Sequence, residues 1–469
     1  MVSILYRVLI ALLSLIAAAP MAAIADVHVP EHQRIVLPNG IVLVLMPEHN
    51  VPLISFAAVL RGGAAADAPG KAGVASLYAG LLEKGAGART AFAFADAVAG
   101  AGGSFDAGAD SESVVIRGQF LSRDHALMME LLADALLRPR LDASEFATLR
   151  QRQIEFIKAS KDSDPKSVIG NYGRALLFAA HPYGAPVAGS VHSLAGITLT
   201  DVKAFQHDQI GSDRLTLVFT GDIDAAGLRK TVTDAFGQLP RAAKAAPSLA
   251  LTSSVTGRRV LLIDSPKSVQ TYFWLANVGV SRKFPQRAAL DLVNTLYGGR
   301  FSSMLNSELR IKSGLTYGAG SGFRRGTVPG EFAISSFTQT DNTVKAIDLA
   351  LATLDTLHRD GVSASMVDSA RAYLLGQYPT RLETAAHWAG VFADLELYRL
   401  GPGYIEGYGP ALKKVTESDA RAIIDADFPS SQNLVMVLIG DAAKIRAAVA
   451  KYGPLAEMSF DADEYWPKH

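Results

Sequence analysis

The amino-acid sequence predicts an α+β protein made of two similar halves. Short apolar strand patterns alternate with amphipathic helix patterns, so sheets are expected to pack against helices. One unit, a strand followed by Gly-Asp, a helix and an aromatic-Gly pair, occurs at Gly221 and again at Gly440, 440 − 221 = 219 residues later. A repeat at about half the chain length indicates a duplicated domain. The 469 residues are also too many for one ordinary core.

The first 25 residues have the pattern of a secretory signal peptide. Residues 8–19 form an apolar run, broken by one Ser, after the single charge of Arg7, and an Ala-x-Ala end follows at Ala25. We therefore expect residues 1–25 to be cleaved and the mature protein to be exported to the periplasm. A retained membrane anchor is the alternative, but the run is short for a bilayer span.

Strand patterns precede helix patterns along the first half. Strands are expected at residues 34–37, 41–46, 53–60 and 113–120, and helices at residues 72–85, 125–137 and 144–160. The first of these helices carries apolar residues at i, i+3, i+4 and i+7 from Val74, so one of its faces should be buried.

A segment rich in Ala, Ser and Lys separates the two halves. Residues 241–257 contain a Pro and lack clear periodicity, as is typical of a linker. We therefore expect a first domain at residues 26–240, a linker at 241–255 and a second domain at 256–469.

The composition excludes several classes of function. The chain has no Cys, which excludes disulfide frameworks, Cys-ligated metals and thiol nucleophiles. Its 45 Lys and Arg balance 45 Asp and Glu, which argues against nucleic acid as the main partner. Catalysis would therefore use His, carboxylates, hydroxyls, Lys, Arg or a group borrowed from elsewhere.

One segment matches a metal-binding pattern in its letters alone. His28 to His32 reads His-x-x-Glu-His, which binds zinc when a helix places both His on one face. Pro30 lies inside the required turn, and Pro in a helix interior costs about 3 kcal/mol. We interpret this match as accidental.

Four ordered motifs span nearly the whole expected mature chain. They are residues 62–85, with Pro-Gly-Lys-Ala-Gly before a helix, the His-Pro-Tyr-Gly of residues 181–184, and residues 296–305 and 309–317. Together they resemble the pitrilysin/insulinase family of zinc metallopeptidases, in its processing-peptidase-like branch. The resemblance implies two homologous domains, each a mainly antiparallel sheet packed with helices, that close like a clam shell.

The sequence departs from this family at its zinc site. The family's two His and the Glu between them fall at Ser76, Ala79 and Gly80, and its third zinc ligand falls near Lys158. None of the first three can bind zinc or act as general base, and an ammonium repels a divalent cation. The sequence therefore predicts no metal in this chain.

The resemblance assigns a different role to Arg310 and Tyr317, seven residues apart in the second half. In the family, the matching pair faces the zinc across the chamber. The Tyr hydroxyl can donate to the scissile carbonyl as charge develops, and the Arg can hold a neighbouring carbonyl or the substrate terminus. Taken singly, Arg310 would be a surface helix-end cation and Tyr317 an ordinary strand aromatic.

We therefore expect a non-catalytic subunit of an exported heterodimeric or heterotetrameric zinc peptidase. It would be inactive alone and hydrolyse peptide or unfolded protein only with a homologous partner that carries the zinc. In this family the chamber binds the substrate as an added β-strand. The alternative is a structural or binding pseudo-peptidase with no role in hydrolysis. A third possibility, an active enzyme with an unrelated site, finds no supporting constellation in the sequence.

Overall fold

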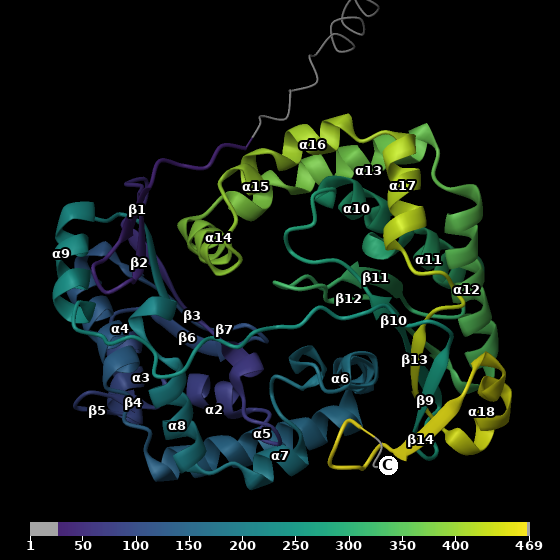
Figure 1. Ribbon diagram of the computed structural model, residues 1–469, viewed down its shortest axis with the longest axis horizontal. Helices are drawn as coiled ribbons and strands as arrows, with labels where there is room; N and C mark the ends of the chain where they lie inside the picture. Colours follow the sequence, from purple (N-terminus) through teal and green to yellow (C-terminus); the bar gives the residue numbers. More distant parts are fainter. Residues whose placement is uncertain (1–26, 467–469) are drawn as a thin grey trace, which may run out of the picture.

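Each half of the chain forms its own six-stranded sheet, and the two sheets belong to two lobes (Figure 1). The computed structural model describes residues 27–466, so the expected signal peptide lies outside the described residues. The first sheet contains, in spatial order, β1 (Gln33–Val36), β2 (Val42–Pro47), β8 (Leu215–Gly221), β3 (Leu53–Arg61), β7 (Ser113–Leu121) and β6 (Ser104–Ala109). The second contains β11 (Ala319–Phe323), β12 (Glu331–Gln339), β10 (Gln270–Val278), β13 (Val435–Gly440), β9 (Arg259–Asp264) and β14 (Leu455–Ser459).

The two sheets repeat one topology. β2 pairs with β8 in parallel, as β9 does with β13, and β3 lies antiparallel between β8 and β7 as β10 does between β13 and β12. The outer strands β6 and β11 also correspond. Only the opposite edge differs, because β1 is antiparallel to β2 and β14 is parallel to β9. The predicted α+β class with two homologous, mostly antiparallel sheets is confirmed.

Helices cover both sheets. The first half contains α2 (Val74–Leu81), α3 (Ala91–Gly100), α4 (His125–Leu137), α5 (Ala143–Ser163), α6 (Pro165–Phe178), α7 (Val191–Gly196), α8 (Leu199–Gln209) and α9 (Ala225–Phe236). The second half contains α10 (Arg287–Asn294), α11 (Met304–Asn306), α12 (Thr343–Asp360), α13 (Ala364–Gln377), α14 (Ala385–Leu397), α15 (Gly403–Glu406), α16 (Tyr408–Lys414), α17 (Glu417–Asp427) and α18 (Ala442–Val449). Between residues 27 and 466, no helix is long and apolar enough to cross a membrane.

The helix expected at residues 72–85 is shorter than its pattern predicts. It ends at Leu81, because Gly85 takes a φ of 101° and begins the short hairpin of β4 (Gly85–Ala86) and β5 (Arg89–Thr90). A positive φ favours glycine and cannot continue a right-handed helix.

The two halves exchange one helix each. Helix α6 of the first half packs on β10 and β13 of the second sheet, and α14 of the second half packs on β3 and β8 of the first (Figure 1). These are equivalent strand pairs in the two topologies. One hydrophobic cluster consequently runs through both halves, since it includes Phe56 and Leu217 together with Trp274 and Val437. A continuous apolar interface of this kind holds the lobes as one rigid body.

The helix α6 lies so close to β10 that a glycine is required at the crossing. A Cβ atom on Gly173 would lie 2.3 Å from Cε3 of Trp274, which is 5% exposed. By contrast, a Cβ on Gly170, one turn earlier, would meet only the flexible end of Arg174, at 3.1 Å.

We predict opposite effects for two Gly→Ala substitutions on α6. Gly173→Ala should lower the free energy of unfolding by about 1–3 kcal/mol through overpacking against Trp274. Gly170→Ala should leave it unchanged or raise it by up to about 1 kcal/mol, because Ala favours the helix. Urea denaturation followed by Trp fluorescence measures both. Equal loss of stability in the two variants would contradict the proposed crossing.

Candidate functional site

Helix α2 is held at its start by a half-buried carboxylate. Asp67 accepts hydrogen bonds from the backbone N–H groups of Gly73 and Ala75, both at 2.8 Å, and Gly73 adopts a φ of 106°. These bonds satisfy backbone donors that a helix N-terminus leaves free. Burial raises the pKa of Asp67 to about 7, although the backbone hydrogen bonds oppose this shift.

Side chains of α5 occupy the face of α2 that carries Ser76 and Gly80. A Cβ on Gly80 would lie 2.9 Å from Cδ2 of Leu149, so Leu149 fills the space of a larger side chain. The Gln153 amide donates to the Ser76 hydroxyl at 3.4 Å and also to the carbonyl oxygen of Ala188. Ala79 is buried. Neutral and apolar groups of this kind do not fit zinc, which prefers imidazole, thiolate or carboxylate ligands.

The structure shows that Lys158, near which the third family ligand was expected, does not face α2. Lys158 lies on the exposed side of α5, whereas Gln153, five residues earlier, faces α2. The crossing of α5 over α2 decides which residue of α5 faces α2, and this crossing cannot be read from positions along the chain. Within residues 27–466, no group of three or more His, Asp or Glu is arranged to hold a metal ion.

The segment from His28 to His32 forms no helix, as Pro30 predicts. The Nδ1 atom of His32 lies 2.9 Å from the carbonyl oxygen of Pro30, and its ring packs 4.5 Å from the ring of Phe392 on α14. His32 is therefore part of the contact between the N-terminal segment and the second half.

Arg310 and Tyr317 lie together on the second lobe. Arg310 belongs to a π-helical turn, η6 (Ser307–Lys312), and such turns are frequent at functional sites. Its guanidinium carbon lies 4.7 Å from the centre of the Phe301 ring and 5.9 Å from that of Tyr317. Phe301 is 64% exposed and Tyr317 is 83% exposed, so two rings and a cation face solvent side by side. Such contacts orient the guanidinium without consuming its hydrogen-bond donors.

Phe301 was not singled out by the sequence reasoning. Its signal was available, because it directly follows the Gly-Gly-Arg of the motif at residues 296–305. An exposed aromatic residue in such a motif has no packing role to explain it.

A cavity of about 450 Å³ adjoins Tyr317 and is lined by both halves. Lys166 and Ile169 come from α6, whereas Tyr272 and Phe337 come from neighbouring strands of the second sheet. The two rings stack with centres 5.6 Å apart. The exchanged helix α6 therefore brings a cation and an apolar side chain of the first half next to Tyr317.

The open edge of β6 is partly occupied by this chain itself. The carboxylate of Glu83, which follows α2, accepts a hydrogen bond from the backbone N–H of Ala107 on β6 at 2.5 Å. Burial raises the pKa of Glu83. An incoming strand would need this N–H, so Glu83 competes with any peptide that adds to β6.

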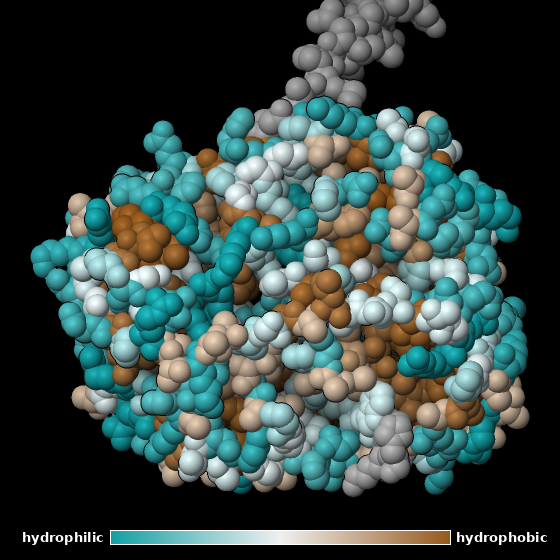
Figure 2. Space-filling model, viewed as in Figure 1, coloured by the Kyte–Doolittle hydropathy of each residue, from teal (hydrophilic) through white to brown (hydrophobic). Residues whose placement is uncertain are grey.

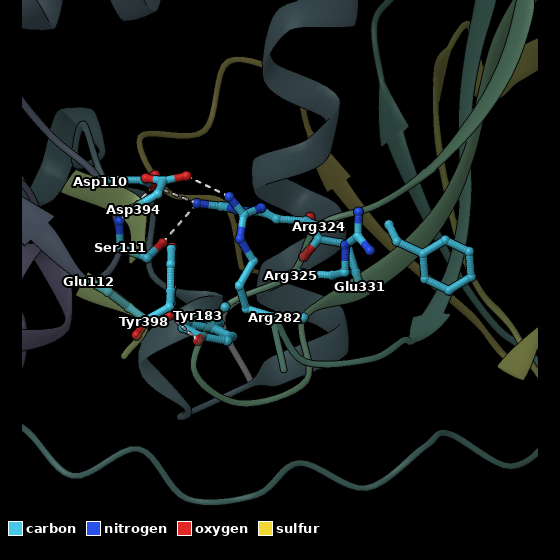
Figure 3. Close-up of a pocket in the computed structure, with 13 residues that line it drawn as sticks. Asp110, Ser111, Glu112, Tyr183, Arg282, Arg324, Arg325, Glu331, Asp394 and Tyr398 are labelled. Atoms are coloured by element: carbon cyan, nitrogen blue, oxygen red, sulfur yellow. Dashed lines mark hydrogen bonds and ion pairs between the residues drawn. The ribbon is translucent and has the colours of Figure 1, made fainter. Parts of the chain in front are cut away.

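Polar side chains join the lobes at a second cavity (Figure 3). Arg324 lies 2.8 Å from Asp110, and Arg282 lies 2.5 Å from Asp394. Tyr183, from the His-Pro-Tyr-Gly motif, donates its hydroxyl hydrogen to Glu112 at 2.5 Å. The motif is therefore explained by a contact at the lobe junction.

Comparisons with known proteins agree with this geometry. The sequence profile of a family described as Insulinase (Peptidase family M16) matches residues 43–190, and that of the Peptidase M16 inactive domain matches residues 196–374. An uncharacterised zinc protease of Mycobacterium leprae is 27% identical over 78% of this chain and 82% of its own. The non-peptidase homolog YmxG of Helicobacter pylori is 24% identical over 72% of this chain and 77% of its own.

Solved structures share the fold. A peptidase M16 inactive domain from Pseudomonas fluorescens superposes with a TM-score of 0.81 and 23% identity, over 87% of this chain and 98% of that one. A protease from Helicobacter pylori gives a TM-score of 0.80 and 21% identity, over 88% of this chain and the whole of that one.

We predict a pH dependence of stability from Asp67. Its pKa of about 7 in the folded protein lies above the value of about 3.9 for an unfolded chain, so the folded protein binds the extra proton. The resulting stabilisation is present below pH about 4 and is lost as the pH rises through about 7. Urea denaturation from pH 4 to 8 should show this decline, and Asp67→Asn should remove it. Asp96→Asn, on the exposed side of α3, should leave the decline unchanged; a decline that persists in Asp67→Asn contradicts the assignment.

We also predict which α5 residue can complete a zinc site. The starting variant carries Ser76→His and Gly80→His, which place two imidazoles on one face of α2. It also carries Leu149→Ala, which makes room for them. Adding Gln153→Glu should bind zinc at least about tenfold more tightly than adding Lys158→Glu, because only position 153 faces α2. Calorimetric titration with zinc compares the two variants. Equal affinities would show that position 153 is not the inward one.

Proposed function

Because the chain belongs to the insulinase family of metallopeptidases, M16, and lacks that family's zinc-binding residues, we propose that it is the non-catalytic subunit of an exported two-chain zinc peptidase. A homologous partner would bear the zinc, and this chain would supply Arg310 and Tyr317. The observation that carries the proposal is the pairing of these two residues on an exposed surface, while the zinc positions on α2 hold neutral groups.

The chemistry asked of this chain is binding and charge stabilisation. The Tyr317 hydroxyl would donate a hydrogen bond to the peptide carbonyl on which negative charge develops. The Arg310 guanidinium, oriented by Phe301, would hold a neighbouring carbonyl or a terminal carboxylate with its planar donors. The substrate would be an extended peptide or an unfolded protein. Because Glu83 occupies part of β6, the second half is the better platform for that contact.

A structural or binding pseudo-peptidase is the second candidate. It is favoured by one observation, the relative in Helicobacter pylori whose name is non-peptidase homolog. In that case the chain would assemble with partners, while Arg310 and Tyr317 would be dispensable for any hydrolysis.

We predict that hydrolysis appears only when this chain is mixed with a zinc-bearing homologue. In the mixture, Tyr317→Phe should lower kcat by about 10²-fold, the usual effect of removing one transition-state donor. Arg310→Ala should lower kcat/KM. A fluorogenic peptide assay measures both values, and size-exclusion chromatography checks that assembly is unchanged.

Matched substitutions control for indirect effects. Tyr404→Phe on α15 removes a hydroxyl elsewhere in the second half, and Arg359→Ala removes an exposed cation at the end of α12. Both should leave the rate unchanged. Wild-type rates in both site variants would favour the pseudo-peptidase, and hydrolysis by the purified single chain with stoichiometric zinc would overturn both candidates.

A further inference from the structure

The lobe junction contains another cavity, beside the one in Figure 3, that is lined by more cations than carboxylates. It has a volume of about 460 Å³ and lies next to the cavity of Figure 3, with which it shares Glu112, Arg282 and Tyr398. The first half contributes Arg61 at the end of β3, the connecting segment contributes residues 246–249, and the second half contributes Lys283. Both lobes and the connection between them therefore meet at this cavity.

Four cations line the cavity, together with a single carboxylate. The cations are Arg61, Arg282, Lys283 and Arg399. The carboxylate, Glu112, is already engaged: it accepts from the hydroxyl of Tyr183 at 2.5 Å, from the backbone N–H of Thr327 at 2.7 Å, and from the Thr327 hydroxyl. These donors share the negative charge of Glu112. In the described part of the chain, Glu112 forms no ion pair with any of the four cations.

Two other carboxylates near the cavity are engaged elsewhere, and a third neutralises Arg282. Among the described residues, Arg61, Lys283 and Arg399 therefore remain without an ion pair. Glu396 forms a two-pronged pair with Arg34, at 2.6 and 3.0 Å, and Asp213 lies 3.4 Å from Arg241. Asp394 pairs with Arg282 at 2.5 Å. No described carboxylate forms an ion pair with Arg399 or Lys283, both of which are exposed at the mouth of the cavity.

The arrangement costs stability in the absence of a ligand. Burial lowers the pKa of Arg61, and the positive charge of Arg399 lowers it further, although Asp213 and Glu396 oppose this shift. Arg399 also adopts a φ of 52°, a left-handed conformation that is unfavourable for a residue with a side chain. Like charges held together on a strained backbone are common where a ligand supplies the missing counter-charge.

We propose that this cavity binds a small multivalent anion that carries phosphate or carboxylate groups. Guanidinium groups bind both kinds of oxygen anion in two-pronged fashion, and Lys283 adds a compact charge at the mouth. Because Arg61 belongs to the first half and Lys283 and Arg399 belong to the second, the bound anion would bridge the lobes and stabilise their junction. This site is independent of the surface formed by Arg310 and Tyr317.

The full-length protein tests this proposal directly. Inorganic pyrophosphate and citrate serve as the phosphate and carboxylate probes, each titrated at constant ionic strength adjusted with NaCl, by calorimetry and by thermal unfolding. At least one probe should bind saturably and raise Tm. The probe that binds more tightly identifies the class of the natural ligand.

Two substitutions at the mouth of the cavity give the decisive contrast. Arg399→Gln and Lys283→Gln should each weaken binding of the preferred probe by about tenfold, since each removes a charge that faces the ligand. Arg399→Gln should also raise Tm without ligand, because it relieves the repulsion with Arg61. Matched exposed cations, Arg229→Gln on α9 and Lys203→Gln on α8, should change neither quantity.

Either of two results would overturn the proposal. One is the absence of saturable binding of both probes to the wild-type protein. The other is binding whose strength does not depend on the cations at the mouth: either Arg399→Gln and Lys283→Gln leave it at wild-type strength, or the control variants weaken it as much as they do. In both cases the anion would bind as a general counter-ion. Lys283→Gln keeps the test valid should Arg399→Gln fold poorly, since Lys283 is exposed and makes no described contact with a carboxylate.

Discussion

The packing of one helix from each half on the sheet of the other is the constraint on which the rest of the molecule depends. Helix α6 covers β10 and β13, and α14 covers β3 and β8. The exchange merges the cores of the two halves, so neither lobe can move without exposing apolar surface. It also sets the position of each candidate site, because α6 lines the cavity beside Tyr317 and α14 ends at Leu397, two residues before Arg399 at the lobe junction.

The two halves of the duplication have diverged in what their equivalent regions present. On the first lobe, α2 holds small or neutral residues against Leu149 and Gln153, and Glu83 covers part of the neighbouring strand edge. On the second lobe, the half-buried Arg310 lies beside two exposed aromatic rings. This difference between the lobes is what supports the proposal that Arg310 and Tyr317 act as donors opposite a metal held by a partner.

The lobe junction joins an apolar interface to a polar one. On the face shown in Figure 2, hydrophobic residues form several separate patches, one near the middle and others on the left and right sides, among hydrophilic residues. Inside the junction, the pairs Arg324–Asp110 and Arg282–Asp394 are balanced, whereas the neighbouring cavity has cations in excess. Apolar packing supplies most of the stability there, and the unbalanced charges are therefore better explained by a ligand than by folding.

The sequence by itself determined the fold class and the duplication, because periodicity and a repeat can be read locally along the chain. The assignment of the family's zinc positions to Ser76, Ala79 and Gly80 came from the resemblance to that family. The resemblance also singled out Arg310 and Tyr317, which lie in one short motif. The sequence did not show that Gln153 is the residue of α5 whose side chain reaches Ser76 on α2, and it gave no sign of the cation-lined cavity. Only the tertiary structure decided these points. Gln153 meets Ser76 across 77 residues of chain, and Arg61 meets Arg399 across 399 − 61 = 338 residues, which requires the two lobes to be joined.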